Sequence, residues 1–150
     1  MSNLVDLFPS IQNVMRVEIE SYGASNAQAL LSRYQDASDE LYEAGDPEGT
    51  VAALSSETTL AAILGAFAVA KAFLELWQQW KKTFPARQEQ SESDISKLAD
   101  VVEAKVAKDQ TLHRSKHAQM LLTKARQLLR SDRGRTLLIA FINSAHESGM

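Results

Sequence analysis

The sequence contains no cysteine, and this absence excludes several kinds of chemistry. Without a thiol there is no disulfide, no thiolate nucleophile and no cysteine-ligated metal. Chains without disulfides are typical of reducing compartments. Residues 1–12 also lack the basic start, apolar block and small-residue cleavage site of a secretory leader. We therefore expect a cytoplasmic protein.

Turn-forming residues are also scarce, with six glycines and three prolines in 150 residues. Because strand-like alternation of apolar and polar residues is rare as well, the pattern favours helices over a sandwich or barrel. A chain of this length can bury a core of its own. The prediction is an all-α fold: a single-domain helical bundle of about five to six helices around a central hydrophobic helix at residues 56–83. A polar loop is expected near residues 86–93 and a frayed C-terminus near 147–150.

The central helix is predicted from the apolar run between residues 55 and 85. Ser55 or Ser56 can cap its start, and Pro85 ends it. One apolar stripe follows helical spacing: Leu60, Ile63, Phe67, Ala70, Leu74 and Trp77. Small residues on the opposite face would let another backbone come close: Ala61, Gly65, Ala68 and Ala72.

A membrane-spanning role for this helix is the alternative. The uncharged window, residues 58–70, ends at Lys71, and it is shorter than the roughly 20 apolar residues that a spanning helix needs. We therefore predict a core helix. Small-residue faces also serve helix association, so burial in an oligomer or entry into a membrane stays open.

The N-terminal third predicts two helices. Residues 3–22 follow helical spacing with a start at Pro9 and Ser10, although residues 14–19 also alternate like a strand. Gly23 ends this element, and Ser25 or Asn26 can cap the next. A further break is predicted at residues 45–47, where Gly, Asp and Pro succeed one another.

The C-terminal third predicts amphipathic helices. A helix starting at Ser93 or Asp94 has one apolar face: Ile95, Leu98, Val102 and Val106. Residues 110–130 hold a basic amphipathic helix, and Ser131 is a candidate cap for a last helix. For residues 136–142, a buried strand is the alternative to a helix.

The net charge of −3 conceals an uneven distribution. Residues 1–57 contain ten acidic residues and two arginines, whereas residues 94–150 contain ten lysines and arginines and six acidic residues. The two ends could neutralise each other within the fold, which we favour, or one of them could face an outside partner.

No catalytic pattern is present. The sequence has no glycine-rich phosphate loop, nucleophile elbow, Ser-His-Asp arrangement or acidic metal cluster, so we predict that the chain is not an enzyme and uses no cofactor. His113 and His117 are one helical turn apart and could share a metal. However, Arg114 stands where a metalloprotease has glutamate, and His146 is remote in sequence, so no metal site is predicted.

These features predict a non-enzymatic helical protein–protein interaction domain of the adaptor, regulator or effector type, with self-association as one form of that interaction. Aromatic residues and arginines are common interface anchors, and Trp77 and Trp80 look exposed. The candidate partner-binding residues are Phe73, Trp77, Trp80, Lys81, Lys82, Phe84, Lys116, Lys124, Arg126 and Arg130.

Two alternatives use other surfaces. A membrane-active toxin or pore-forming effector would use the central apolar helix together with the basic helix. Nucleic-acid binding would use the basic helix alone, although the acidic pI of about 5.6 and the lack of interleaved aromatic residues disfavour it. The identity of the partner and the oligomeric state do not follow from the sequence.

Overall fold

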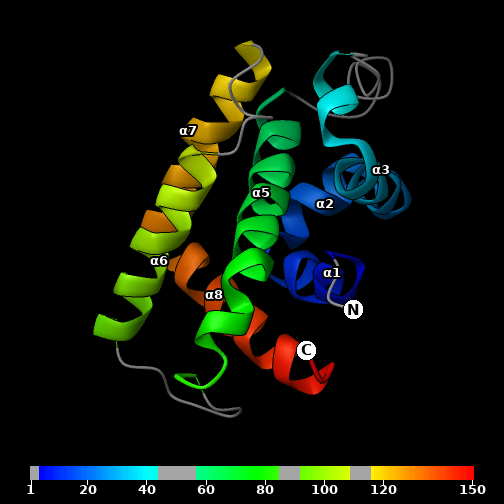
Figure 1. Cartoon of the computed structure of the whole chain (residues 1–150). Helices are drawn as coiled ribbons and strands as arrows, with labels where there is room; N and C mark the ends of the chain where they lie inside the picture. Colours follow the sequence, from blue (N-terminus) through cyan, green and yellow to red (C-terminus); the bar gives the residue numbers. More distant parts are fainter. Residues whose placement is uncertain (1–3, 44–56, 85–91, 109–115) are drawn as a thin grey trace.

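The computed structural model describes residues 4–43, 57–84, 92–108 and 116–150, and within these ranges it contains helices and no strand (Figure 1). The helices are α1 (Leu4–Val14), α2 (Arg16–Tyr22), α3 (Ala24–Glu43), α5 (Glu57–Trp80), α6 (Glu92–Ala107), α7 (Lys116–Arg130) and α8 (Asp132–Glu147). The all-α prediction is confirmed. The strand alternatives at residues 14–19 and 136–142 are wrong, because both stretches are helical.

Helix α5 is the central element, as predicted. It runs through the middle of Figure 1, with α6 and α7 on one side and α1, α2 and α3 on the other. Between residues 61 and 70, every side chain except that of Ala62 is buried. The front half of the helix is therefore enclosed by the rest of the bundle, while its second half keeps an exposed edge at Glu75, Gln78 and Gln79.

The small-residue face of α5 receives α7. A Cβ atom added at Gly65 would lie 3.2 Å from the backbone nitrogen of Ala125, a contact between two helix backbones. Ala61, Ala68 and Ala72 on the same face are also buried. The expected close approach of another backbone is confirmed, and the neighbouring backbone is that of α7.

The predicted first helix differs from the observed one in two ways. It begins at Leu4 rather than at Pro9, which lies inside α1. Proline there forfeits one helical hydrogen bond, but Leu4, Leu7 and Ile11 bury the same face, and the Leu4 backbone N–H donates to the Gln35 side chain at 3.2 Å. The packing of this face thus outweighs the helix start that the sequence indicates at Pro9. The helix is also interrupted at Met15, and α2 begins at Arg16.

Gly23 joins α2 to α3 in a conformation that favours glycine, with φ of 108°. The predicted cap at Ser25 or Asn26 is wrong, because α3 already starts at Ala24. The Asn26 side chain instead donates to the Tyr22 carbonyl at 3.3 Å and satisfies the end of α2. Gly23 itself donates to the Ile19 carbonyl at 2.7 Å.

The turn between α7 and α8 is built as the sequence predicts. Ser131 accepts a hydrogen bond from the Gly134 backbone at 3.1 Å, which caps α8, and its hydroxyl donates to the Leu128 carbonyl at 2.7 Å. At Gly134 the two helices come so close that a Cβ atom would lie 1.8 Å from the Leu128 carbonyl oxygen. Glycine is therefore required here for lack of space.

Backbone hydrogen bonds close the C-terminal end of α8, the stretch where a frayed end is predicted at residues 147–150. Gly149, with φ of 71°, donates to the His146 carbonyl at 3.1 Å, and Met150 donates to the Ala145 carbonyl at 3.0 Å. This pair of bonds is the Schellman arrangement that closes helices ending in a left-handed glycine. Met150 also packs against the core.

Some predictions lie outside the described residues: the break at residues 45–47, the caps at Ser55 and Ser56, and most of the polar loop at 86–93. Helix α6 begins at Glu92, one residue before the predicted caps. Its apolar face, Ile95, Leu98, Val102 and Val106, is buried as predicted.

Candidate interaction surface

Most of the aromatic residues predicted to bind a partner lie in the core. Phe73 and Trp77 are 0% exposed and Phe84 is 5% exposed. The rings of Phe73 and Trp77 stack with centroids 5.3 Å apart, and Phe141 of α8 lies 5.4 Å from Phe73. The expectation that Trp77 is exposed is wrong. Its place on the stripe that begins at Leu60 was the signal that it faces inward.

Polar contacts hold this aromatic cluster together. The indole N–H of Trp77 donates to the Met150 carbonyl at 3.2 Å. His146 meets the Trp77 ring edge-on, with centroids 5.0 Å apart, and its Nε2 atom donates to the Phe84 carbonyl. The end of α5 is thereby tied to the end of α8, and these residues stabilise the fold.

Three predicted residues remain at the surface where α5 ends. Trp80 is half-buried and packs at an angle on Phe73, with centroids 6.1 Å apart. Lys81 is half-buried and Lys82 is exposed. Of the partner-binding residues predicted at the end of α5, Trp80, Lys81 and Lys82 are therefore the ones that a partner can reach.

The basic residues of α7 form a second group. Arg126 and Arg130 are 47% and 74% exposed, and both contact Glu103 of α6, at 3.4 Å and 3.1 Å. Lys124 is half-buried beside Gly65 of α5. Lys116 begins α7, and its side chain lies outside the described residues. Glu103 thus fixes two arginines and offsets half of their charge, which weakens the case for nucleic acid.

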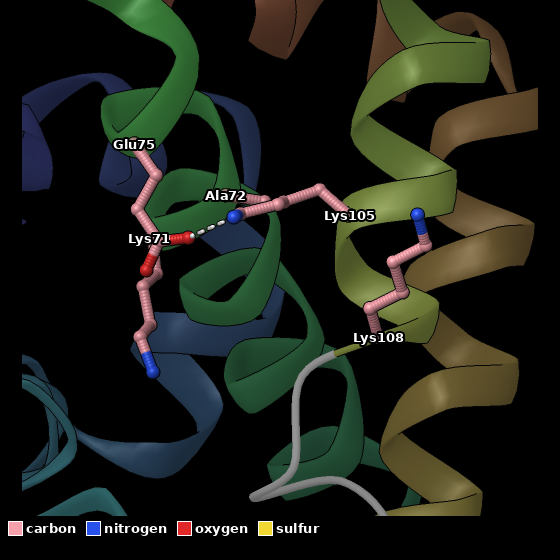
Figure 2. A pocket seen from close by; sticks show the side chains of 5 residues that line it. All are labelled: Lys71, Ala72, Glu75, Lys105 and Lys108. Carbon is pink, nitrogen blue, oxygen red and sulfur yellow. Dashed lines mark ion pairs between the residues drawn. The ribbon is translucent and has the colours of Figure 1, made fainter.

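A pocket of about 130 Å³ lies at the seam between α5 and α6 (Figure 2). Lys105 reaches across from α6 and pairs with Glu75 of α5 at 3.2 Å, and Lys71, Ala72 and Lys108 complete the lining. The ammonium of Lys71 lies 5.8 Å from the centre of the Tyr34 ring on α3. The ion pair between Lys105 and Glu75 therefore joins α6 to α5.

Arg133 links the acidic N-terminal part of the chain to the basic C-terminal part. Its guanidinium donates to both carboxylate oxygens of Glu18, at 2.5 Å and 2.7 Å, and to the Val14 carbonyl at 2.8 Å. These hydrogen bonds from Arg133 hold the pKa of Glu18 below its usual value, against the opposing effect of burial, and they raise the pKa of Arg133. This pair joins one acidic residue of the N-terminal part to one basic residue of the C-terminal part, and no sequence motif indicated it.

Metal-ligating side chains do not gather in groups of three or more within the described ranges. His113 and the side chain of His117 lie outside those ranges. The third histidine, His146, is engaged with the Phe84 carbonyl.

By length and composition, α5 could cross a membrane, and this corrects the argument that its apolar run is too short. The segment Thr59–Trp80 has 22 residues, and the polar interruptions at Lys71 and Glu75 do not disqualify it. In the bundle, 61% of its most apolar window is buried. Core helices of soluble proteins pass the same test, so the observation is compatible with both roles.

Family models, curated proteins and solved structures gave no match.

Proposed function

We propose that this chain is a non-enzymatic helical protein–protein interaction domain of the adaptor, regulator or effector type. The observation that carries the proposal is the cluster of Arg126, Arg130 and Glu103. Arginine is a frequent interface anchor because its planar head makes several hydrogen bonds at once. Glu103 holds both guanidinium groups in place while Arg130 stays 74% exposed, so less side-chain freedom is lost on binding.

A binding role also agrees with where the unusual titratable groups lie. Active sites concentrate groups with shifted pKa values in a cleft. Within the part of the chain that the structure describes, the groups with a shifted pKa are Glu18, Arg133 and Tyr22, which belong to α2 and α8 and do not line the pocket between α5 and α6. The shift of the first two is explained by their mutual ion pair, and that of Tyr22 by burial, so they support structure rather than catalysis.

Proximity labelling in cells tests the proposal. Arg126→Glu with Arg130→Glu should remove a defined set of labelled proteins, and Trp80→Ala should do the same if the end of α5 contributes. The matched control replaces exposed residues on α1 and α2 with acidic ones (Gln12→Glu, Asn13→Glu, Arg16→Glu), which lowers the net charge by the same amount. Circular dichroism confirms that each variant folds. If wild type, variants and control label the same proteins, the proposal fails.

A membrane-active role is the second candidate, and the length and apolar character of α5 favour it. In that case the bundle opens and α5 enters lipid, so the protein should release dye from vesicles containing anionic lipid. Lys71→Leu removes a charge from the spanning segment and should increase release, because a charged residue at the membrane centre costs about 2.5 to 3.5 kcal/mol. A protein that leaves such vesicles intact over a wide pH range is not membrane-active.

A further inference from the structure

We propose that residues 146–150 form a strap that closes over the end of α5 and opens while the rest of the bundle stays folded. When the strap is closed, it covers the indole edge of Trp77. When it is open, that edge joins the accessible surface around Trp80, which lies one helical turn further along α5. The inference rests on the proposed function, because the strap then controls how much of the end of α5 a partner can reach.

Three contacts join the strap to the end of α5. The indole N–H of Trp77 donates to the Met150 carbonyl at 3.2 Å, and the His146 ring meets the Trp77 ring edge-on with centroids 5.0 Å apart. The Nε2 atom of His146 also donates to the carbonyl of Phe84, just beyond the end of α5. The strap and the end of α5 thus meet where both helices finish (Figure 1).

The body of α8 is held by other neighbours than the strap. It packs mainly on α1, α6 and α7. The buried side chains that precede the strap in this helix are Leu137, Leu138, Phe141, Ile142 and Ala145. Within the strap, by contrast, Glu147, Ser148 and Gly149 are exposed. The strap can therefore leave α5 without disturbing the packing that holds α8 in the bundle.

The closed form of the strap depends on a left-handed glycine. With φ of 71°, Gly149 donates to the His146 carbonyl at 3.1 Å and lets Met150 donate to the Ala145 carbonyl at 3.0 Å. Helix ends that are held by few contacts open at a lower free energy than the core of a protein. Opening exposes the indole edge of Trp77, so a partner that covers this edge shifts the population toward the open form.

Native-state hydrogen exchange on the purified full chain tests the strap. The reporter is the indole N–H of Trp77, and because the chain has two tryptophans, Trp80→Phe assigns its signal. Local opening exposes little surface, so exchange of this proton should hardly depend on urea at low concentrations of the denaturant. The backbone amides of Phe141 and Ile142 in the body of α8 should instead show the full urea dependence of global unfolding.

Gly149→Ala should open the strap without altering the aromatic cluster. Alanine disfavours the left-handed backbone, and nothing lies within 4 Å of the added Cβ atom. The Trp77 indole N–H should therefore exchange faster by roughly fivefold to thirtyfold. Ser148→Ala is the matched control, because this neighbouring residue is exposed and has an ordinary φ of −83°, and it should leave the exchange rate unchanged. Circular dichroism verifies that both variants fold.

Two results would overturn the strap: a Trp77 indole proton that exchanges with the free energy and urea dependence of the Phe141 amide, or a Gly149→Ala variant that exchanges no faster than Ser148→Ala. Proximity labelling reads binding separately. Gly149→Ala should increase the labelling of those proteins that Trp80→Ala removes. If Trp80→Ala reduces labelling and Gly149→Ala leaves it unchanged, the strap does not control binding, and the proposed function stands. If no variant changes labelling, the proposed function fails, while hydrogen exchange still decides whether the strap opens.

Discussion

Replacing Gly134 with alanine should strongly destabilise the bundle. The added Cβ atom would lie 1.8 Å from the carbonyl oxygen of Leu128 and 2.9 Å from the Cα atom of Leu129, whereas ordinary contacts begin near 3.4 Å. These neighbours are backbone atoms of α7, so no side chain can rotate away. The two helices must separate by roughly an ångström, which loosens the packing of α8.

The magnitude follows from two opposing effects. Alanine is favoured over glycine in a helix by about 1 kcal/mol. The overlap with α7 outweighs that gain, because overpacking that moves the backbone costs about 1 to 3 kcal/mol and severe cases cost more. Because the overlap is with backbone atoms, the case is a severe one, and a cost of about 3 to 5 kcal/mol less the gain of about 1 leaves a net loss of about 2 to 4 kcal/mol in the free energy of unfolding.

Two other glycines serve as internal controls. At Gly65 the added Cβ atom would lie 3.2 Å from the Ala125 nitrogen, a tight contact that a small shift relieves, so the loss should be smaller than at Gly134. At Gly149 nothing lies within 4 Å, and alanine suffers only the left-handed backbone, which costs roughly 1 to 2 kcal/mol. Urea unfolding followed by far-UV circular dichroism measures all three variants. If Gly134→Ala is as stable as the wild type with an unchanged slope, the described approach of α7 and α8 is wrong.

Two further predictions concern ties between distant parts of the chain. Glu18→Gln should lower stability at neutral pH by about 1 kcal/mol or less, since the Arg133 pair is partly exposed. Because Arg133 lowers the folded-state pKa of Glu18, the wild-type advantage is fully present above the usual carboxyl pKa of about 4.5 and disappears as pH falls through the folded-state value; a difference that persists in acid would contradict the assignment. Trp77→Phe should cost about 1 to 2 kcal/mol and speed hydrogen exchange at Gly149 and Met150, because the bond to the Met150 carbonyl is lost. Trp80→Phe, at a half-buried ring without a role at the C-terminus, should leave that exchange unchanged, and equal effects of the two variants would refute the tie.

The helices that the sequence predicts best are those whose signals are local. Helical spacing acts within a few residues, so α5, α6 and α8 appear where the pattern places them, and Ser131 caps α8 as predicted. The small residues of α5 also predicted a closely packed neighbour, because small side chains leave space for another backbone whichever helix supplies it. Which helix would fill that space, α7, was beyond local information.

The residues of the candidate interaction surface also divide into those that the local sequence places correctly and those that packing places elsewhere. The exposed positions of Lys82, Arg126 and Arg130 agree with the predicted polar faces, since long charged side chains avoid burial without a partner. Trp77 and Phe84 were assigned to the surface because a tryptophan beside lysines resembles an interface anchor. The return of α8 to the end of α5 decided otherwise, by bringing His146 and Met150 onto them.

Three properties follow from the order of the amino acids alone: the protein is helical, its central helix lies at a predictable place, and its two ends carry opposite charge. These properties depend on residue spacing and composition, which can be read from the linear sequence without knowledge of the fold. Three other features become visible in the folded chain: α1 tolerates Pro9, Arg133 pairs with Glu18, and the C-terminal end of α8 is capped. Each of these depends on groups far apart in the chain, whose meeting is set by how the helices pack, and packing energy outweighs local preference wherever the two conflict.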